Sequence, residues 1–170
     1  MAQHNDAPTP VDPQLFLELT TRRTSAVGLV TARVDGWDYA AVVSDYLFIS
    51  YEPPSVLVSL YELSRIAEAL EQAESWVLHV LSAQQEPIAR RLAEPGAPLV
   101  GLLERIAHTR RVAEGPAWIT GALATFECET LSTQQVATHQ LFAGRVIAQA
   151  GAPDLSAALL RHRGAYRAID

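Results

Sequence analysis

Residues 39–60, YAAVVSDYLFISYEPPSVLVSL, constrain the fold more than any other part of this chain. They contain two runs of apolar and β-branched residues, a composition that favours β-strands. Pro53 and Pro54 lie between the runs and cannot donate ladder hydrogen bonds, so the chain is expected to turn there. Ser44 and Asp45 interrupt the first run in mid-strand. This polar pair is expected either to bond to nearby backbone groups, with or without a bulge, or to face a ligand.

Apolar periodicity along the rest of the chain predicts hairpin strands. Residues 26–34 form an apolar run that ends at Asp35 and Gly36, a dipeptide typical of a tight hairpin turn. Residues 122–131 alternate between apolar and polar positions, which is the period of a half-buried strand. Strands are therefore expected over residues 26–34, 37–48, 55–60, 76–81, 122–131 and 134–148.

A few short helices are expected between the strands. Asp12 followed by Pro13 is typical of an N-cap with proline at the first helical position, and Ser64 is expected to cap a second helix. Residues 94–116 contain several prolines and glycines and no sustained period, which indicates irregular structure. Helical segments are therefore expected over about 13–23, after Ser64, over 84–92 and for one turn around 99–106.

This order of elements favours one mainly β domain, an antiparallel barrel with peripheral helices, because the strands follow one another as hairpins without a repeating strand–helix period. A chain of 170 residues with 49% hydrophobic content can bury a substantial core, so a single domain is expected over 13–170. Residues 1–12 are polar and contain proline. They are expected to form a flexible arm, of a kind that sometimes embraces a partner subunit.

Composition excludes several classes of function and several kinds of site. The net charge of −6 argues against nucleic acid as a partner. All 13 basic residues are arginine, which removes Schiff-base chemistry and any lysine-dependent phosphate loop. Cys128 is the single cysteine, so no internal disulfide forms and no multi-cysteine metal site is expected. Neither a targeting segment nor an apolar run approaching ~20 residues is present, and a cytoplasmic protein that does not span a membrane is expected.

Four segments in order resemble the flavin reductase-like family. They are residues 50–54 with the strand that follows, Val77 to Glu86, His139 to Val146, and Arg163 to Tyr166. The resemblance implies a dimeric FMN-binding split β-barrel. The implied activity is hydride transfer from NADH or NADPH to FMN or FAD, with the reduced flavin supplied to a partner monooxygenase. The sequence does not distinguish between the two flavins or between the two nicotinamide dinucleotides.

The resemblance also implies site residues. His139 corresponds to the family histidine near the flavin and the incoming nicotinamide, and an imidazole there is suited to orienting a carboxamide or carbonyl. Ser64 opens a helix whose free N–H groups favour an anion, and Arg65 can add a charge-assisted hydrogen bond. The positions that correspond to cofactor contacts are Val42, Val43, Ser44, Asp45, Tyr46, Ser50, Ser59, Ser64, Arg65 and Ile66.

Several alternatives remain open at this level. Val42, Phe48 and Ile66 stand where the family has hydroxyl groups, which favours an accessory protein with little turnover. A flavoprotein that reduces an organic substrate directly is a third possibility, which the sequence does not separate from the flavin reductase. His139 is equally compatible with a plain strand start. Glu127 and Glu129 share a strand face, where solvated acids are more common than a catalytic pair, and His79 is expected to be a hydrogen-bonded structural residue. Arg110 and Arg111 are compatible with two interpretations: they contact a dinucleotide phosphate, or they form an exposed basic surface on an acidic protein.

Overall fold

A computed structural model describes residues 10–94, 101–152 and 157–169. Its helical elements are α1 (Pro13–Thr20), α2 (Arg65–Gln72), the short 3-10 segment η1 (Ala83–Gln85) and α3 (Glu86–Leu92). Its strands are β1 (Ser25–Ala26), β2 (Gly28–Val34), β3 (Trp37–Val43), β4 (Tyr46–Tyr51), β5 (Pro54–Tyr61), β6 (Trp76–Val80), β7 (His108–Thr109), β8 (Trp118–Ile119), β9 (Ala124–Val136), β10 (His139–Gly151), β11 (Ala158–His162) and β12 (Ala165–Ile169).

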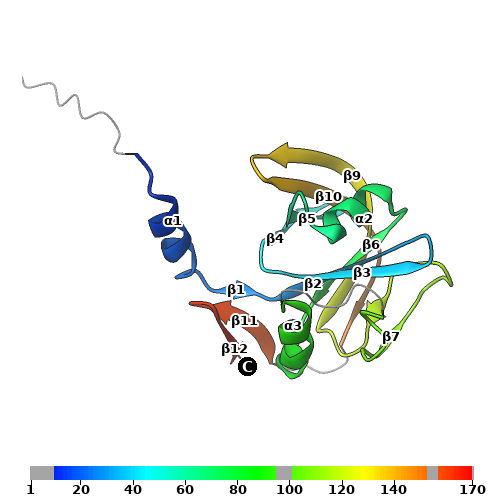
Figure 1. Ribbon diagram of the computed structural model, residues 1–170. Helices are drawn as coiled ribbons and strands as arrows, with labels where there is room; N and C mark the ends of the chain where they lie inside the picture. Colours follow the sequence, from blue (N-terminus) through cyan, green and yellow to red (C-terminus); the bar gives the residue numbers. More distant parts are fainter. Residues whose placement is uncertain (1–9, 95–100, 153–156, 170) are drawn as a thin grey trace, which may run out of the picture.

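The main body is a seven-stranded antiparallel sheet in the order β3-β2-β6-β9-β10-β5-β4. The Asp45 carbonyl, just beyond the end of β3, accepts a hydrogen bond from the Ser59 N–H at 2.9 Å, so the β4–β5 pairing extends to the bend that joins β3 and β4, the two edge strands of this sheet. α2 lies over the barrel, and α3 lies at the other side of β2 and β3 (Figure 1). The predicted antiparallel barrel with peripheral helices is confirmed.

Two apolar cores stabilise this arrangement. The first fills the barrel and includes Trp76, Phe142 and Leu70, the last contributed by α2. The second lies on the other face of β2 and packs Leu29 against Leu159 of β11 and the segment that precedes β8. β11 also pairs with β1 and β12 in a separate three-stranded sheet. The C-terminal hairpin is thereby fixed to the start of the barrel.

Two strand boundaries differ from the sequence-based expectation. Ser44 and Asp45 do not lie in mid-strand: they form the bend between β3 and β4, because β3 pairs with β2 whereas β4 pairs with β5. The long hairpin turns at Ala137 and Thr138, beyond the expected polar connection at residues 132–133. Its outer half is exposed on both faces, so no buried side requires the apolar alternation that marks a strand.

Helix α1 stands apart from the barrel (Figure 1). It begins as predicted, with Asp12 Oδ1 accepting a hydrogen bond from the Gln14 N–H at 2.9 Å, but it ends at Thr20. None of its side chains is buried. Residues 1–9 of the expected arm and residues 95–100 of the irregular segment lie outside the described residues. Of the helices described, none has the length and apolar character needed to cross a membrane.

Candidate functional site

A cavity of about 610 Å³ opens between α1, the β3–β4 bend, the start of β10 and the β11–β12 turn. It brings together three of the residues predicted from the sequence, namely Ser44, Asp45 and His139. Its other lining residues are Phe16, Leu17, Thr20, Thr21, Arg23, Ser25, Arg161, Arg163 and Gly164. We refer to this space below as the cavity.

The β3–β4 bend forms one wall of the cavity. The Asp45 carbonyl is held by the Ser59 N–H, so the backbone of the bend is fixed to β5. The Asp45 carboxylate forms an ion pair with Arg23, which follows α1. Both side chains remain more than half exposed. The wall therefore combines a fixed backbone with a charged pair that solvent and ligands can reach.

His139 starts β10 at the mouth of the cavity. It pairs in register with Tyr61 of β5, and the Tyr61 ring lies edge-on to the imidazole with ring centroids 6.1 Å apart. Thr138 Oγ1 lies 3.3 Å from His139 Nδ1. The imidazole is exposed, so it is available to a ligand in the cavity.

Arg161 and Arg163, which we call the hairpin arginines, form the wall that sequence reasoning did not assign to the site. Arg163 and Gly164 have φ values of 49° and 73°, which give the two-residue β11–β12 connection its left-handed turn. The Arg163 N–H donates to the Thr21 carbonyl at 2.9 Å, which fixes this turn to the end of α1. The sequence had marked Arg163 to Tyr166 only as part of the family resemblance and had given these residues no role, because strand β11 itself was not predicted.

The other residues predicted on β3, β4 and β5 do not line the cavity. Val43 is buried in the barrel core, whereas Val42, which faces the opposite way, packs against the second core. Tyr46 is half-buried, and burial raises the pKa of its phenol to about 12. Ser50 lines a different, apolar cavity of about 400 Å³ beside Phe48, and Ser59 is half-buried next to the bend.

The predicted phosphate motif lies at the start of α2. Ser64 is the N-cap, and its Oγ accepts a hydrogen bond from the Ala67 N–H at 3.3 Å. Arg65 is exposed, but Ile66 is only 4% exposed and belongs to the barrel core, so its side chain cannot contact a ligand. The Ser64 N–H donates to the carbonyl of Tyr61, the residue that pairs with His139. The α2 start therefore lies near the cavity without lining it.

Glu127 and Glu129 do not form a carboxylate pair. Glu127 is 1% exposed, and it accepts hydrogen bonds from Arg111 Nε at 3.0 Å, Trp118 Nε1 at 2.8 Å and Ser75 Oγ at 3.1 Å. Burial by itself raises the pKa of Glu127, but these three donors outweigh it and hold the pKa below the usual value. Glu129 is half-exposed and pairs with Arg145 instead. Glu127 differs from the solvated acid that was expected, because loop residues cover it.

His79 is the structural residue that the sequence predicted. Its Nδ1 lies 2.9 Å from the Leu29 carbonyl, and its Nε2 accepts a hydrogen bond from the Ile119 N–H at 3.0 Å. The side chain is fully buried, and this burial lowers its pKa to about 4. Neutral His79 therefore joins β2 to β8 and takes no part in the cavity.

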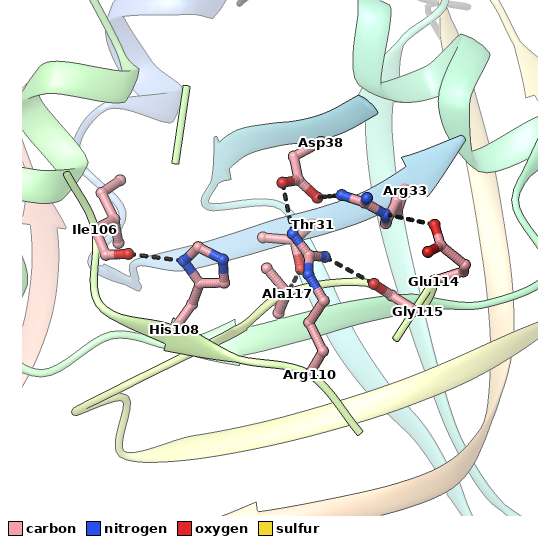
Figure 2. A network of polar contacts seen from close by, with 9 residues as sticks. All are labelled: Thr31, Arg33, Asp38, Ile106, His108, Arg110, Glu114, Gly115 and Ala117. Atoms are coloured by element: carbon pink, nitrogen blue, oxygen red, sulfur yellow. Dashed lines mark hydrogen bonds and ion pairs between the residues drawn. The ribbon is translucent and has the colours of Figure 1, made fainter. Parts of the chain in front are cut away.

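Arg110 and Arg111 are both committed to carboxylates of the chain. Figure 2 shows Arg110 donating to Asp38 Oδ2 at 2.6 Å and to the Gly115 carbonyl at 2.7 Å. Asp38 is shared with Arg33, which also reaches Glu114 at 3.4 Å. This network holds residues 106–117 against the β2–β3 hairpin. The suggested role of these two arginines at a dinucleotide phosphate is therefore not supported by their positions.

Comparison with known proteins gives a consistent result. Residues 21–170 match the family described as flavin reductase like domain. The reductase component of a 4-nitrophenol 4-monooxygenase/4-nitrocatechol 2-monooxygenase from Rhodococcus opacus is 30% identical over 84% of this chain and 75% of its own length. The NADH-dependent FMN reductase AsuE2 from Streptomyces nodosus subsp. asukaensis is 30% identical over 85% of this chain and 78% of its own length. Among solved structures, BorF, the flavin reductase component of a bacterial two-component tryptophan halogenase, superimposes with a TM-score of 0.86 at 25% identity, covering 93% of this chain and 98% of BorF.

Proposed function

Since the chain belongs to the flavin reductase-like family, we propose that it uses NADH to reduce FMN in the cavity and supplies the reduced flavin to a partner monooxygenase. The family and its relatives make the chain an NAD(P)H:flavin oxidoreductase. The observation that carries the assignment to this cavity is that Ser44, Asp45 and His139, far apart in sequence, line one space.

The residues present fit a flavin. The cavity volume of about 610 Å³ lies within the range of ~300–1,000 Å³ that small-molecule sites occupy. Phe16 and Leu17 supply apolar surface for a ring system, and arginine and serine side chains supply polar contacts. The bound flavin supplies the hydride acceptor, so no acid–base triad is required of the protein.

The chain then has three tasks. The β3–β4 bend, held by the bond from Ser59 to the Asp45 carbonyl, presents fixed backbone to the ring. Ser64 and Arg65 at the start of α2 hold the flavin phosphate through the helix N-terminus and a guanidinium. His139 orients the nicotinamide carboxamide from the mouth of the cavity.

A second copy of the chain completes the molecule as a homodimer. α1 exposes Phe16 and Leu17 by 62% and 63%, and the edge strand β4 exposes Leu47 and Tyr51 by 61% and 90%. An edge strand and a helix with this much apolar surface are candidates for an interface. Sedimentation of the purified chain tests this assembly, and a monomer at all concentrations would exclude it.

The first test of the function is oxidation of NADH or NADPH by the purified protein with FMN or FAD in excess, followed by absorbance against a control without enzyme. Flavin-dependent turnover that is fastest with NADH and FMN is expected. No turnover with any pair would favour the accessory protein or the direct reduction of an organic substrate. The missing hydroxyls at Val42, Phe48 and Ile66 motivate the accessory protein, although none of these residues lines the cavity.

The phosphate assignment has its own test. The double variant Ser64→Ala, Arg65→Ala is expected to weaken FMN binding about tenfold, because one charge-assisted hydrogen bond contributes roughly 1.5–3 kcal/mol. FMN affinity is measured by quenching of flavin fluorescence, with circular dichroism as the check on folding. Unchanged affinity in a folded double variant would remove Ser64 and Arg65 from the site.

A further inference from the structure

We infer that the hairpin arginines, Arg161 and Arg163, bind the pyrophosphate of the nicotinamide dinucleotide and thereby determine the affinity for this substrate. The inference rests on the proposed function, because it takes the cavity as the place where flavin and dinucleotide meet. It assigns to the β11–β12 turn a role that differs from that of Ser64 and Arg65.

The hairpin arginines lie where a dinucleotide would meet the flavin. Both hairpin arginines line the same cavity as His139 and the β3–β4 bend. Register fixes them there, because Arg161 pairs with Ser25 of β1, another lining residue, and the Arg163 N–H is bonded to Thr21. Two guanidinium groups on one short turn can offer several donors to neighbouring phosphate oxygens.

The arginines of the cavity differ in their partners within the chain. Arg23, the third arginine in the cavity, is already paired with Asp45. Within residues 10–94, 101–152 and 157–169, neither Arg161 nor Arg163 forms an ion pair with a carboxylate of the chain. Arg161 instead lies 5.9 Å from the centroid of the Tyr166 ring, a cation–π contact that orients the side chain without neutralising it.

The proposed reaction brings two phosphate-bearing molecules together. Hydride transfer requires flavin and dinucleotide to be bound at the same time, and each carries phosphate. Like charges repel, so the two phosphate groups need separate cationic positions. The start of α2 provides one position and the β11–β12 turn provides the other.

The dinucleotide is a substrate that must enter and leave in every turnover. The chain carries a net charge of −6, which repels an anionic substrate at long range. Exposed arginines at the cavity create a local positive potential that offsets this repulsion and speeds association. Exposed groups of this kind suit a substrate that is released in each cycle.

The experiment compares the double variant Arg161→Ala, Arg163→Ala with the wild-type enzyme, using FMN so that the flavin carries a single phosphate. The KM for NADH is expected to rise about tenfold, the effect of losing roughly 1.4 kcal/mol of binding. The affinity for FMN, measured separately by fluorescence quenching, is expected to stay within about twofold. The conservative variant Arg161→Lys, Arg163→Lys is expected to recover part of the loss, since lysine keeps the charge but not the planar fork.

Arg167→Ala is the matched control. Arg167 is exposed on β12 of the same hairpin and does not line the cavity, and its guanidinium donates to the Tyr166 carbonyl at 3.0 Å. Its KM for NADH is expected to equal that of the wild type. If Arg167→Ala raises KM as much as the double variant does, general surface charge explains the effect and the inference fails.

Binding of NAD⁺ to the FMN-loaded protein by calorimetry gives a readout that does not require turnover. If the wild type neither turns over nor binds NAD⁺, both the proposed function and the inference fail. If the wild type turns over but the double variant retains its KM and its NAD⁺ affinity, only the inference fails. Loss of FMN affinity without a change in KM would place the flavin phosphate at these arginines and would also overturn it.

Discussion

Arg110 and Arg111 differ from Arg161 and Arg163 in the source of the anion that pairs with each guanidinium group. Arg110 is 18% exposed and donates to Asp38, while Arg111 donates to the buried carboxylate of Glu127. The hairpin arginines face a cavity, and in the described part of the chain they form no ion pair. An arginine satisfied within the chain holds a loop in place, whereas an arginine whose anion comes from outside is a binding element.

This comparison predicts that the two kinds of arginine site fail differently. Disturbing the ion pairs of Arg110 and Arg111 is expected to lower the free energy of unfolding and to leave NADH affinity unchanged. Removing the hairpin arginines is expected to weaken NADH binding and to leave the free energy of unfolding unchanged. A variant of either kind that changed both properties equally would break the comparison.

The largest effect is expected for Glu127→Ala. It leaves Arg111, Trp118 and Ser75 without their shared acceptor. A loss of about 3–5 kcal/mol is expected, because each hydrogen bond to a charged group contributes roughly 1.5–3 kcal/mol and Arg111, which is half-exposed, is partly hydrated in the variant. Urea unfolding measures the loss. The control is Glu129→Ala, whose half-exposed carboxylate pairs with Arg145 and is expected to contribute less than about 1 kcal/mol. Equal losses in the two variants would contradict the buried role of Glu127.

The next effect concerns the pH dependence that His79 imposes on stability. Its pKa falls from 6.5 in the unfolded chain to about 4 in the folded protein. As the pH is lowered, the imidazole therefore takes up its proton in the unfolded state before it does so in the folded state. Stability is therefore fully present above pH 6.5 and is lost as the pH falls from about 6.5 to about 4, by roughly 3 kcal/mol.

Chemical denaturation at a series of pH values checks this expectation. His79→Gln removes the titrating group, so its stability is expected to fall less steeply than that of the wild type between pH 6.5 and 4. The difference between the two curves isolates His79 from carboxylates that titrate in the same range. Parallel curves would show that His79 does not couple folding to protonation.

A smaller effect is expected for Arg110→Ala. The change removes the bonds to Asp38 and Gly115 that Figure 2 shows, but Asp38 keeps its contact with Arg33. A loss of about 2 kcal/mol is expected, the size of a charge-assisted hydrogen bond. Thermal unfolding and the KM for NADH are measured on the same sample. A raised KM with unchanged stability would move Arg110 into the group of binding arginines.

The smallest effect on stability is expected for Arg23→Ala. The ion pair with Asp45 is more than half exposed on both sides, so less than about 1 kcal/mol is expected. The variant leaves Asp45 without its cation in the cavity, and the KM for NADH is expected to rise. Asp45→Asn keeps Arg23 and is expected to lower the KM instead. A shift in the same direction for both variants would exclude an electrostatic role for the pair.

Local chemistry made much of the fold predictable. Asp35 and Gly36 take the left-handed turn that their sequence indicates, with φ values of 50° and 81°. Ser64 caps α2 as expected, and the alternation of residues 122–131 identified a strand. Each of these features depends on residues within a few positions of one another, where steric and hydrogen-bonding preferences act without the rest of the protein.

The site was predictable only in part. The resemblance pointed to Ser44, Asp45 and His139, and the structure brings these three together in one cavity. Ile66 was included because its neighbours fit a phosphate motif, but a helix turns successive side chains to different sides and places Ile66 in the core. The hairpin arginines were missed because β11 pairs with β1, more than a hundred residues away in the chain.

By itself the sequence determined the class of fold, the helix caps, the main hairpins and the family, because these depend on local patterns and on motif order. Only the tertiary structure decided which charged residues meet which. The β6–β9 register and the packing of residues 106–117 buried Glu127 against Arg111, and the β1–β11 pairing placed Arg161 at the cavity. Coulombic and hydrogen-bond energies depend on distance in space, and that distance is set by contacts between strands remote in sequence.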